Sequence, residues 1–105
     1  MTLSEHQHWL TDFYKQRNWY QLSPFIRLNF LTEEVGEVSQ AIRAVEIGRD
    51  HPGEIEQTPA AQRDHLHEEL ADTLDQVLIL CSKYDIDAEE LLHYSEQKLH
   101  DRFHK

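Results

Sequence analysis

The stretch Glu33-Glu34-Val35-Gly36-Glu37 has an acidic counterpart further along the chain, Glu68-Glu69-Leu70-Ala71-Asp72. Each stretch lies inside a long helical pattern of apolar residues. Because residues three apart share one face of a helix, each stretch presents a pair of carboxylates on one side. The two carboxylate pairs are Glu34 with Glu37 and Glu69 with Asp72. We take these two helices as the framework of the fold.

Apolar residues around both acidic stretches alternate three and four apart, which is the spacing of one helix face. The first stripe consists of Leu28, Leu31, Val35, Val38, Ile42 and Val45. The second consists of Leu66, Leu70, Leu74, Val77 and Cys81. The run from Val77 to Cys81 is apolar throughout, so we expect it to be buried on every side.

Start and stop signals divide the chain into four helices. The starts are the capping boxes Thr2-Leu3-Ser4-Glu5 and Asp87-Ala88-Glu89-Glu90, and the cap-proline pairs Ser23-Pro24 and Thr58-Pro59. The expected ends are near Asn18, at Gly48 and near Tyr84. Residues 49–57 have the composition of a polar loop, and no stretch alternates as a strand does. We predict an all-α, four-helix up-down bundle, formed by residues 1–105 as a single domain.

The charge of the chain restricts its partners. Twenty acidic residues against ten basic ones give a formal net charge of −10, which argues against nucleic acid or an anionic membrane as partner. A small anionic substrate remains compatible, because a bound metal ion reverses the local field. The single Cys81 fits a reducing, cytoplasmic setting, and we see no apolar signal segment or membrane span.

The two carboxylate pairs are expected to face each other. The second and third helices form an antiparallel hairpin, and each pair lies roughly 11 residues, or about 17 Å, from the connection. The second pair also shares its helix face with Ile79 and Leu80, which lie in the apolar run. Carboxylates that converge raise one another's pKa unless a cation joins them. Oxygen ligands of this kind suit Mg²⁺, with Mn²⁺ as the alternative. Either stretch alone would be an ordinary solvated helix face.

These residues resemble a known family. The pattern Glu34-x-x-Glu37 followed by Glu69-x-x-Asp72 resembles the MazG-like, all-α nucleoside triphosphate pyrophosphohydrolases. The segments Arg17-Asn18-Trp19, Pro24 and Leu31–Val38 resemble the branch that includes dCTP pyrophosphatases, and Lys98 with Arg102 resembles the basic motif of the family's last helix. The chain departs from the pattern at Arg102, where the family often has Asn, and at Phe25-Ile26, where the branch often has polar residues.

The resemblance implies hydrolysis of an NTP or dNTP to the monophosphate and pyrophosphate, as a form of nucleotide-pool house-cleaning. It implies Mg²⁺ bound by Glu34, Glu37, Glu69 and Asp72. Glu33 is either a supporting group or base, or a plain surface residue. Lys98 and Arg102 either bind phosphate oxygens or are ordinary cations at a helix C-terminus. Trp19 either stacks on the nucleobase or is a core or interface aromatic.

A chain this short covers its core poorly, so we predict a homodimer or homotetramer, with the site completed by a neighbour. Gly36 lowers helix stability, which is explained if another helix or a ligand approaches closely. We expect the paired histidines His65 and His67 to be surface residues.

Two other classes of protein fit parts of the sequence. A carboxylate-bridged di-iron bundle would use Glu5-His6-Gln7-His8 and Glu90-Leu91-Leu92-His93. Both segments open their helices, however, and in an up-down bundle those two starts lie at opposite ends. A non-catalytic acidic interaction module is the second alternative, and it would show no Mg²⁺ binding.

Overall fold

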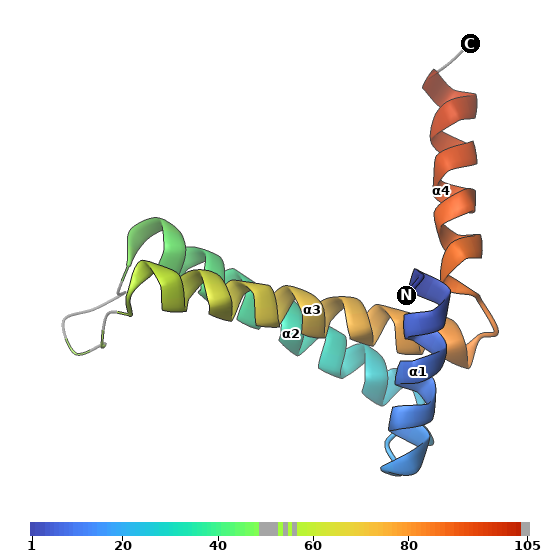
Figure 1. The fold of residues 1–105 in the computed structure, drawn as a ribbon, viewed down its shortest axis with the longest axis horizontal. Coiled ribbons are helices and arrows are strands. Elements are labelled where there is room, and N and C mark those ends of the chain that lie inside the picture. The colour runs from blue at the N-terminus through green and yellow to red at the C-terminus, as the bar shows by residue number, and fades with distance from the viewer. Residues whose placement is uncertain (49–52, 54, 56, 104–105) are drawn as a thin grey trace. The chain divides into compact units, whose positions relative to one another are not determined.

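The computed structural model describes residues 1–48, 53, 55 and 57–103, and the ordered elements in these ranges are all helices. They are α1 (Leu3–Gln16), α2 (Pro24–Ile47), α3 (Pro59–Lys83) and α4 (Ala88–Phe103) (Figure 1). The predicted all-α fold is confirmed. Most of the predicted loop over 49–57, including His51 and Pro52, lies outside the described residues. Within the described ranges, no helix is long and apolar enough to cross a membrane.

The helices begin where the cap signals place them. Thr2 and Glu5 form the predicted capping box, with Glu5 N donating to Thr2 Oγ1 at 3.1 Å and Thr2 N donating to Glu5 Oε1 at 3.0 Å. Thr58 caps α3 by accepting the backbone N–H of Ala61 at 3.2 Å. The Asp87 carboxylate caps α4 in the same way. Local side-chain chemistry therefore sets these three helix starts.

Two helices end slightly earlier than expected. Asn18 and Asp85 have φ angles of 60° and 57°, in the left-handed region that interrupts a right-handed helix. For this reason α1 ends at Gln16 and α3 ends at Lys83. The predicted stop of α2 is confirmed at Gly48, which has a φ of 75°.

The chain divides into two compact units. The terminal unit consists of Met1–Pro24 and Val77–Lys105, and the hairpin unit consists of Phe25–Gln76. Helix α3 contributes its first part to the hairpin unit and its last turns to the terminal unit. That residues 1–105 act as one domain stays a prediction.

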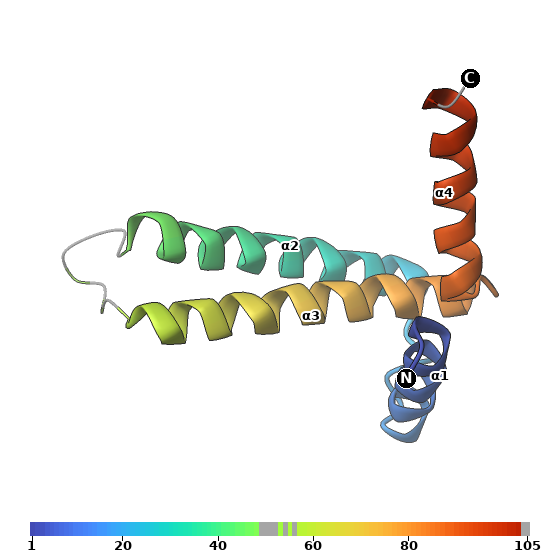
Figure 2. The same cartoon turned by 45° about the horizontal axis from the view of Figure 1, so that its top comes forward.

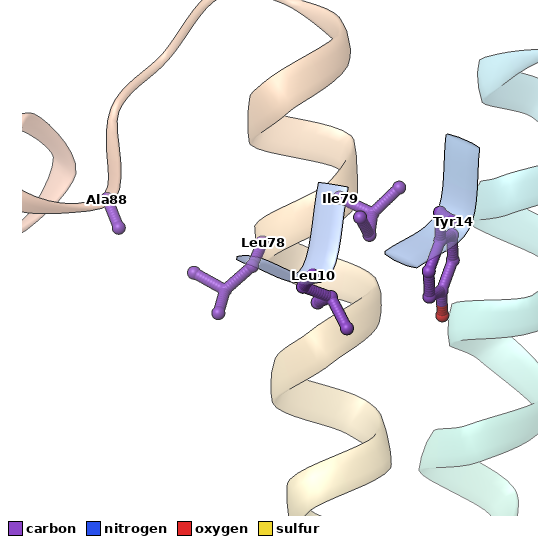
Figure 3. Close-up of a cluster of buried hydrophobic side chains, with 5 residues drawn as sticks. All are labelled: Leu10, Tyr14, Leu78, Ile79 and Ala88. Carbon is purple, nitrogen blue, oxygen red and sulfur yellow. The ribbon is translucent and has the colours of Figure 1, made fainter. Parts of the chain in front are cut away.

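The terminal unit is built around the apolar end of α3. Leu10 and Tyr14 of α1 pack with Leu78 and Ile79 of α3 and with Ala88 at the start of α4 (Figure 3). Leu78 is 2% exposed and Ile79 is 0% exposed. Within the apolar run of α3, Leu78, Ile79 and Cys81 are buried, while Val77 and Leu80 are half-buried. The prediction for this run is thus confirmed at three of its five positions.

A buried glutamine ties α1 to the connection between α3 and α4. The Gln7 amide donates to Leu78 O at 3.1 Å and to Ile86 O at 3.0 Å, and its oxygen accepts from Ala88 N at 2.8 Å. These bonds satisfy three backbone groups at the point where one helix ends and the next begins. Because buried polar groups need partners, Gln7 fixes the geometry of this corner.

The hairpin unit consists of α2 and the first part of α3, which run antiparallel and side by side in both views (Figures 1 and 2). Arg27 Nη1 donates to Gln76 Oε1 across the two helices at 3.3 Å. Two helical turns further along α2, Glu34 lies opposite Glu69, which is two turns before Gln76. One register of α2 against α3 therefore accounts for both the Arg27–Gln76 contact and the approach of Glu34 to Glu69.

The apolar stripe of the hairpin unit is only partly covered. Five of its residues remain between 46% and 54% exposed, namely Leu28, Val35, Ile42, Leu70 and Leu74. The others on α2, Leu31, Val38 and Val45, are half-buried. A pair of helices buries only the faces that meet, and Glu34 and Glu69 occupy part of that meeting face. Because Glu34 and Glu69 occupy this face, part of the apolar stripe lies on the outside of the hairpin.

Candidate metal centre

Three carboxylates converge between α2 and α3. One oxygen each from Glu34, Glu37 and Glu69 lies within 4.8 Å of the others. Among the residues that the structure describes, this is the group of three or more possible metal ligands that comes together. The predicted approach of the two carboxylate pairs is confirmed for these three residues, and we call them the carboxylate cluster.

Asp72 lies at the margin of the carboxylate cluster. It stands outside the group of three, yet its charge is among the causes that raise the pKa of Glu34. Burial raises the pKa of Asp72 itself, and the charges of Glu68, Asp75 and Glu37 raise it further. Asp72 is half-buried. It is therefore electrostatically part of the site, one turn beyond Glu69 on α3.

Two acids of the cluster, Glu34 and Glu69, have raised pKa values. Burial, followed by the charge of Glu37, raises the pKa of Glu34 from 4.5 to about 7. Burial also raises the pKa of Glu69, which is 6% exposed, with Glu37 again contributing. The Oε2 atoms of Glu34 and Glu69 are buried and have no hydrogen-bond partner among the described residues. Carboxylate oxygens in this condition are suited to a hard divalent cation, which supplies the missing positive charge.

One histidine beside the cluster was not predicted. His65 Nε2 lies 3.7 Å from Glu69 Oε1, one turn before it on α3. The expected surface position of His65 is confirmed, because its side chain is 54% exposed. The contact with Glu69 is the part that was missed. The available signal was the i, i+4 spacing of the two residues, which brings side chains together on a helix.

A buried arginine was also missed. Arg27 is 4% exposed and lies on the same face of α2 as Glu34, two turns earlier. In addition to its bond with Gln76, its guanidinium lies 5.2 Å from the centre of the Phe30 ring. An arginine within a helix pattern carries no sequence signal that its side chain is buried. Arg27 places a cation on the meeting face of the hairpin.

The remaining predicted site residues lie elsewhere. Glu33 is exposed on α2 beside Glu34. Trp19 belongs to the terminal unit, where it makes edge-on ring contacts with Phe13 and Tyr14 at 6.0 and 5.4 Å. Lys98 and Arg102 are exposed on α4 in the same unit. The functional roles of these four residues stay predictions: Glu33, Trp19, Lys98 and Arg102.

The segments suggested by the di-iron alternative are engaged in other contacts. Glu5 is held in the cap of α1, and His8 Nε2 lies 3.9 Å from Asp87 Oδ1. His93 Nδ1 lies 3.9 Å from Glu96 Oε2 on α4. In the described part of the chain, these residues do not form a group of three ligands. The geometry therefore favours the carboxylate cluster.

Comparison with known proteins agrees with the site. Residues 25–105 match the MazG nucleotide pyrophosphohydrolase domain, and the chain belongs to this family. The matched segment contains both carboxylate pairs together with Lys98 and Arg102, and it begins after Trp19. A relative in Bacillus subtilis (strain 168), the uncharacterized protein YvdC, is 41% identical over 103 residues, which is 98% of this chain and 97% of the relative. No solved structure matches the chain.

Proposed function

We propose that this protein is a Mg²⁺-dependent pyrophosphohydrolase that converts a nucleoside or deoxynucleoside triphosphate and water into the monophosphate and pyrophosphate. The observation that carries the proposal is the convergence of Glu34, Glu37 and Glu69 in a chain of the MazG family. Buried carboxylate oxygens without a hydrogen-bond partner, such as the Oε2 atoms of Glu34 and Glu69, are unfavourable in the metal-free protein, and a site for a cation accounts for them.

Four carboxylates would hold the metal: Glu34, Glu37, Glu69 and Asp72. When bound, Mg²⁺ neutralises phosphate charge and lowers the pKa of a bound water for attack at the α-phosphorus. The part played by the chain is positioning. Because Glu34 and Glu37 stand one turn apart on α2, and Glu69 and Asp72 one turn apart on α3, the hairpin keeps the ligands in register before substrate arrives. Glu33 is the candidate group that supports the ligands or acts as base.

Three residues outside the carboxylate cluster are proposed to contact the substrate. Lys98 and Arg102 are one turn apart on α4 and would bind phosphate oxygens, for which Arg offers a planar pair of donors. Trp19, 45% exposed, would stack on the nucleobase. With the lone, free Cys81, these features fit a cytoplasmic enzyme that cleanses nucleotide pools.

We propose that the protein works as a homodimer or homotetramer. A second copy is the occupant that suits the exposed stripe, since five apolar residues of one hairpin could pack against the same five of another. Gel filtration should give a multiple of 12.5 kDa, and Leu70→Glu should shift the elution toward the monomer. An active wild-type monomer would contradict this part of the proposal.

The reaction is tested by measuring pyrophosphate release from a panel of NTPs and dNTPs, dCTP included, with and without Mg²⁺. Wild type is compared with Glu37→Gln and Asp72→Asn, which remove a charge with little change in shape. Glu46→Gln is the matched control, because Glu46 is an exposed glutamate on the same helix as Glu37. We expect Mg²⁺-dependent release that falls at least about 100-fold in both site variants and stays unchanged in the control.

Other outcomes are equally informative. No release from any nucleotide, with Mg²⁺ binding still measurable by calorimetry, would move the substrate outside the panel. Absence of both release and Mg²⁺ binding would reject the proposal in favour of the non-catalytic interaction module.

A further inference from the structure

His65 offers a donor of a different kind beside the carboxylate cluster. Its Nε2 atom lies 3.7 Å from Glu69 Oε1, and the Glu69 side chain is 8% exposed. Glu69 is also the residue of α3 that meets Glu34 and Glu37. His65, a candidate nitrogen ligand, therefore lies beside Glu69, the most buried member of the cluster, one turn earlier on α3.

The spacing of His65 and Glu69 suits joint metal binding. Residues at i and i+4 on a helix can bind one ion from the same face, as paired metal ligands on helices do. Two donors that share an ion at about 2.1 Å each lie roughly 3 to 3.6 Å apart. The observed 3.7 Å separation needs only a small rotation of the exposed imidazole.

The neighbouring histidine provides the contrast. His67 lies two residues later, so it points to another side of α3. Its Nδ1 lies 2.8 Å from the backbone oxygen of Arg63, one turn earlier. His67 is thus engaged with its own helix, whereas His65 reaches the cluster.

We propose that His65 is a nitrogen ligand of the metal site, so that the site favours Mn²⁺ over Mg²⁺. Carboxylates suit both Mg²⁺ and Mn²⁺, whereas an imidazole nitrogen adds affinity for a first-row transition ion such as Mn²⁺ and little for Mg²⁺. The inference rests on the proposed function, since it concerns the ion that the carboxylate cluster would hold. The contact between His65 and Glu69 is the observation that identifies His65 as a ligand.

The experiment uses Mn²⁺ as the probe with the full-length protein. Binding is followed by the electron paramagnetic resonance signal of free Mn²⁺, and Mg²⁺ binding is measured by calorimetry. Electron spin-echo modulation of bound Mn²⁺ reports directly whether a ¹⁴N nucleus is coordinated. The variants are His65→Ala and the matched control His67→Ala; both positions are exposed, and alanine is well tolerated within a helix.

We expect ¹⁴N modulation in wild type and in His67→Ala, and its loss in His65→Ala. The affinity for Mn²⁺ should fall about tenfold or more in His65→Ala, while the affinity for Mg²⁺ stays within about twofold. Bound Mn²⁺ without ¹⁴N modulation in wild type, or modulation that survives in His65→Ala, would overturn the proposal. Either result would make the contact an ordinary ion pair and leave Mg²⁺-dependent pyrophosphate release untouched. Loss of that release alone would overturn the proposed reaction instead.

Discussion

Asp87, which caps α4, and Glu34, which lies within α2, are both carboxylates, yet their surroundings shift their pKa values in opposite directions. In the terminal unit, the Ser4 hydroxyl donates to Asp87 at 2.6 Å, and this bond lowers the pKa of the carboxyl group. The pKa of Glu5 is likewise lowered, by its bond from the Thr2 backbone. In the hairpin unit, the pKa values of Glu34 and Glu69 are raised by burial. The terminal unit uses acids as hydrogen-bonded helix caps, whereas in the hairpin unit the Oε2 atoms of two acids are buried with no hydrogen-bond partner among the described residues.

The apolar residues show the same contrast. Ile79 is fully enclosed in the terminal unit, whereas Leu74, about one and a half turns earlier on the same helix, is 46% exposed. In the terminal unit, apolar groups are enclosed and acids lie at the starts of helices. The hairpin places acids on its inner face and leucines outside, which is costly for folding and useful for binding a cation.

The largest expected effect comes from breaking the enclosed core. Ile79→Ala should lower the free energy of unfolding by about 2 to 5 kcal/mol, because it leaves a cavity that the packed helices cannot fill. Denaturant unfolding followed by circular dichroism measures the change. Leu74→Ala is the comparison: its cost should grow with protein concentration if a second copy covers the exposed stripe. If Leu74→Ala lowered the free energy of unfolding as much as Ile79→Ala does, at every protein concentration, the contrast between the enclosed core and the exposed stripe would be wrong.

A slightly smaller effect is expected at the corner held by Gln7. Gln7→Leu keeps the approximate volume but leaves Leu78 O, Ile86 O and Ala88 N without the partner they have now. Unsatisfied buried groups of this kind should cost roughly 2 to 4 kcal/mol. Gln16→Leu, at an exposed position of α1, should change stability by less than about 0.5 kcal/mol. Similar unfolding midpoints for the two variants would show that the corner does not depend on Gln7.

In the hairpin unit, removing an acid should raise the stability of the metal-free protein instead of lowering it. Glu69→Gln takes away a buried charge whose pKa is raised, so the metal-free variant should melt a few degrees higher than wild type. The same substitution should abolish the increase in melting temperature that Mg²⁺ gives to wild type. Thermal melts with and without Mg²⁺ test both statements, with Glu46→Gln as control. A metal-free variant that melts lower than wild type would mean that the charge already has a partner.

The titration of Glu34 gives a prediction for pH. Its folded pKa of about 7 lies above the ordinary 4.5, so the folded state binds the proton more tightly than the unfolded state. The contribution of Glu34 to stability is therefore full below pH 4.5 and is lost as the pH rises through 7. Mg²⁺ must displace this proton, so its affinity should rise from pH 6 to pH 8. Calorimetry in buffers with different ionisation enthalpies should detect proton release near pH 6.5, which Glu34→Gln should reduce.

The smallest expected effect concerns Gly36. A Cβ atom built at this position meets nothing within 4 Å, so Gly36→Ala should stabilise the isolated hairpin by about 0.5 to 1 kcal/mol. If the open space is needed by substrate or by a second copy, the same variant should lose activity or dimerise more weakly. Combined unfolding, gel filtration and kinetic measurements separate these results. A gain in stability with unchanged activity and assembly would show that the glycine has no role in close approach.

The starts of the helices and the approach of Glu34, Glu37 and Glu69 could be predicted, because both depend on the spacing of residues along the sequence. Caps at Thr2, Thr58 and Asp87 act on residues two or three positions away, and the register of a hairpin follows from the lengths of its helices. Burial of Gln7 and Arg27 could not be predicted in this way. A polar residue on a helix has the same sequence pattern whether it meets water or a carbonyl oxygen from a residue seventy positions away. The contact of His65 had a local signal, but that signal is common on solvated helices.

The two carboxylate pairs lie opposite each other along α2 and α3, and this alignment limits which insertions and deletions the gene can tolerate. The carboxylate pairs are aligned by the number of residues between each pair and the inner end of its helix, Gly48 on one side and Pro59 on the other. One residue inserted within either interval would turn a pair by about 100° and shift it by about 1.5 Å relative to its partner. The same insertion between Gly48 and Thr58 would leave both intervals unchanged. Length variation during descent should therefore accumulate between the two helices and be purged from within them.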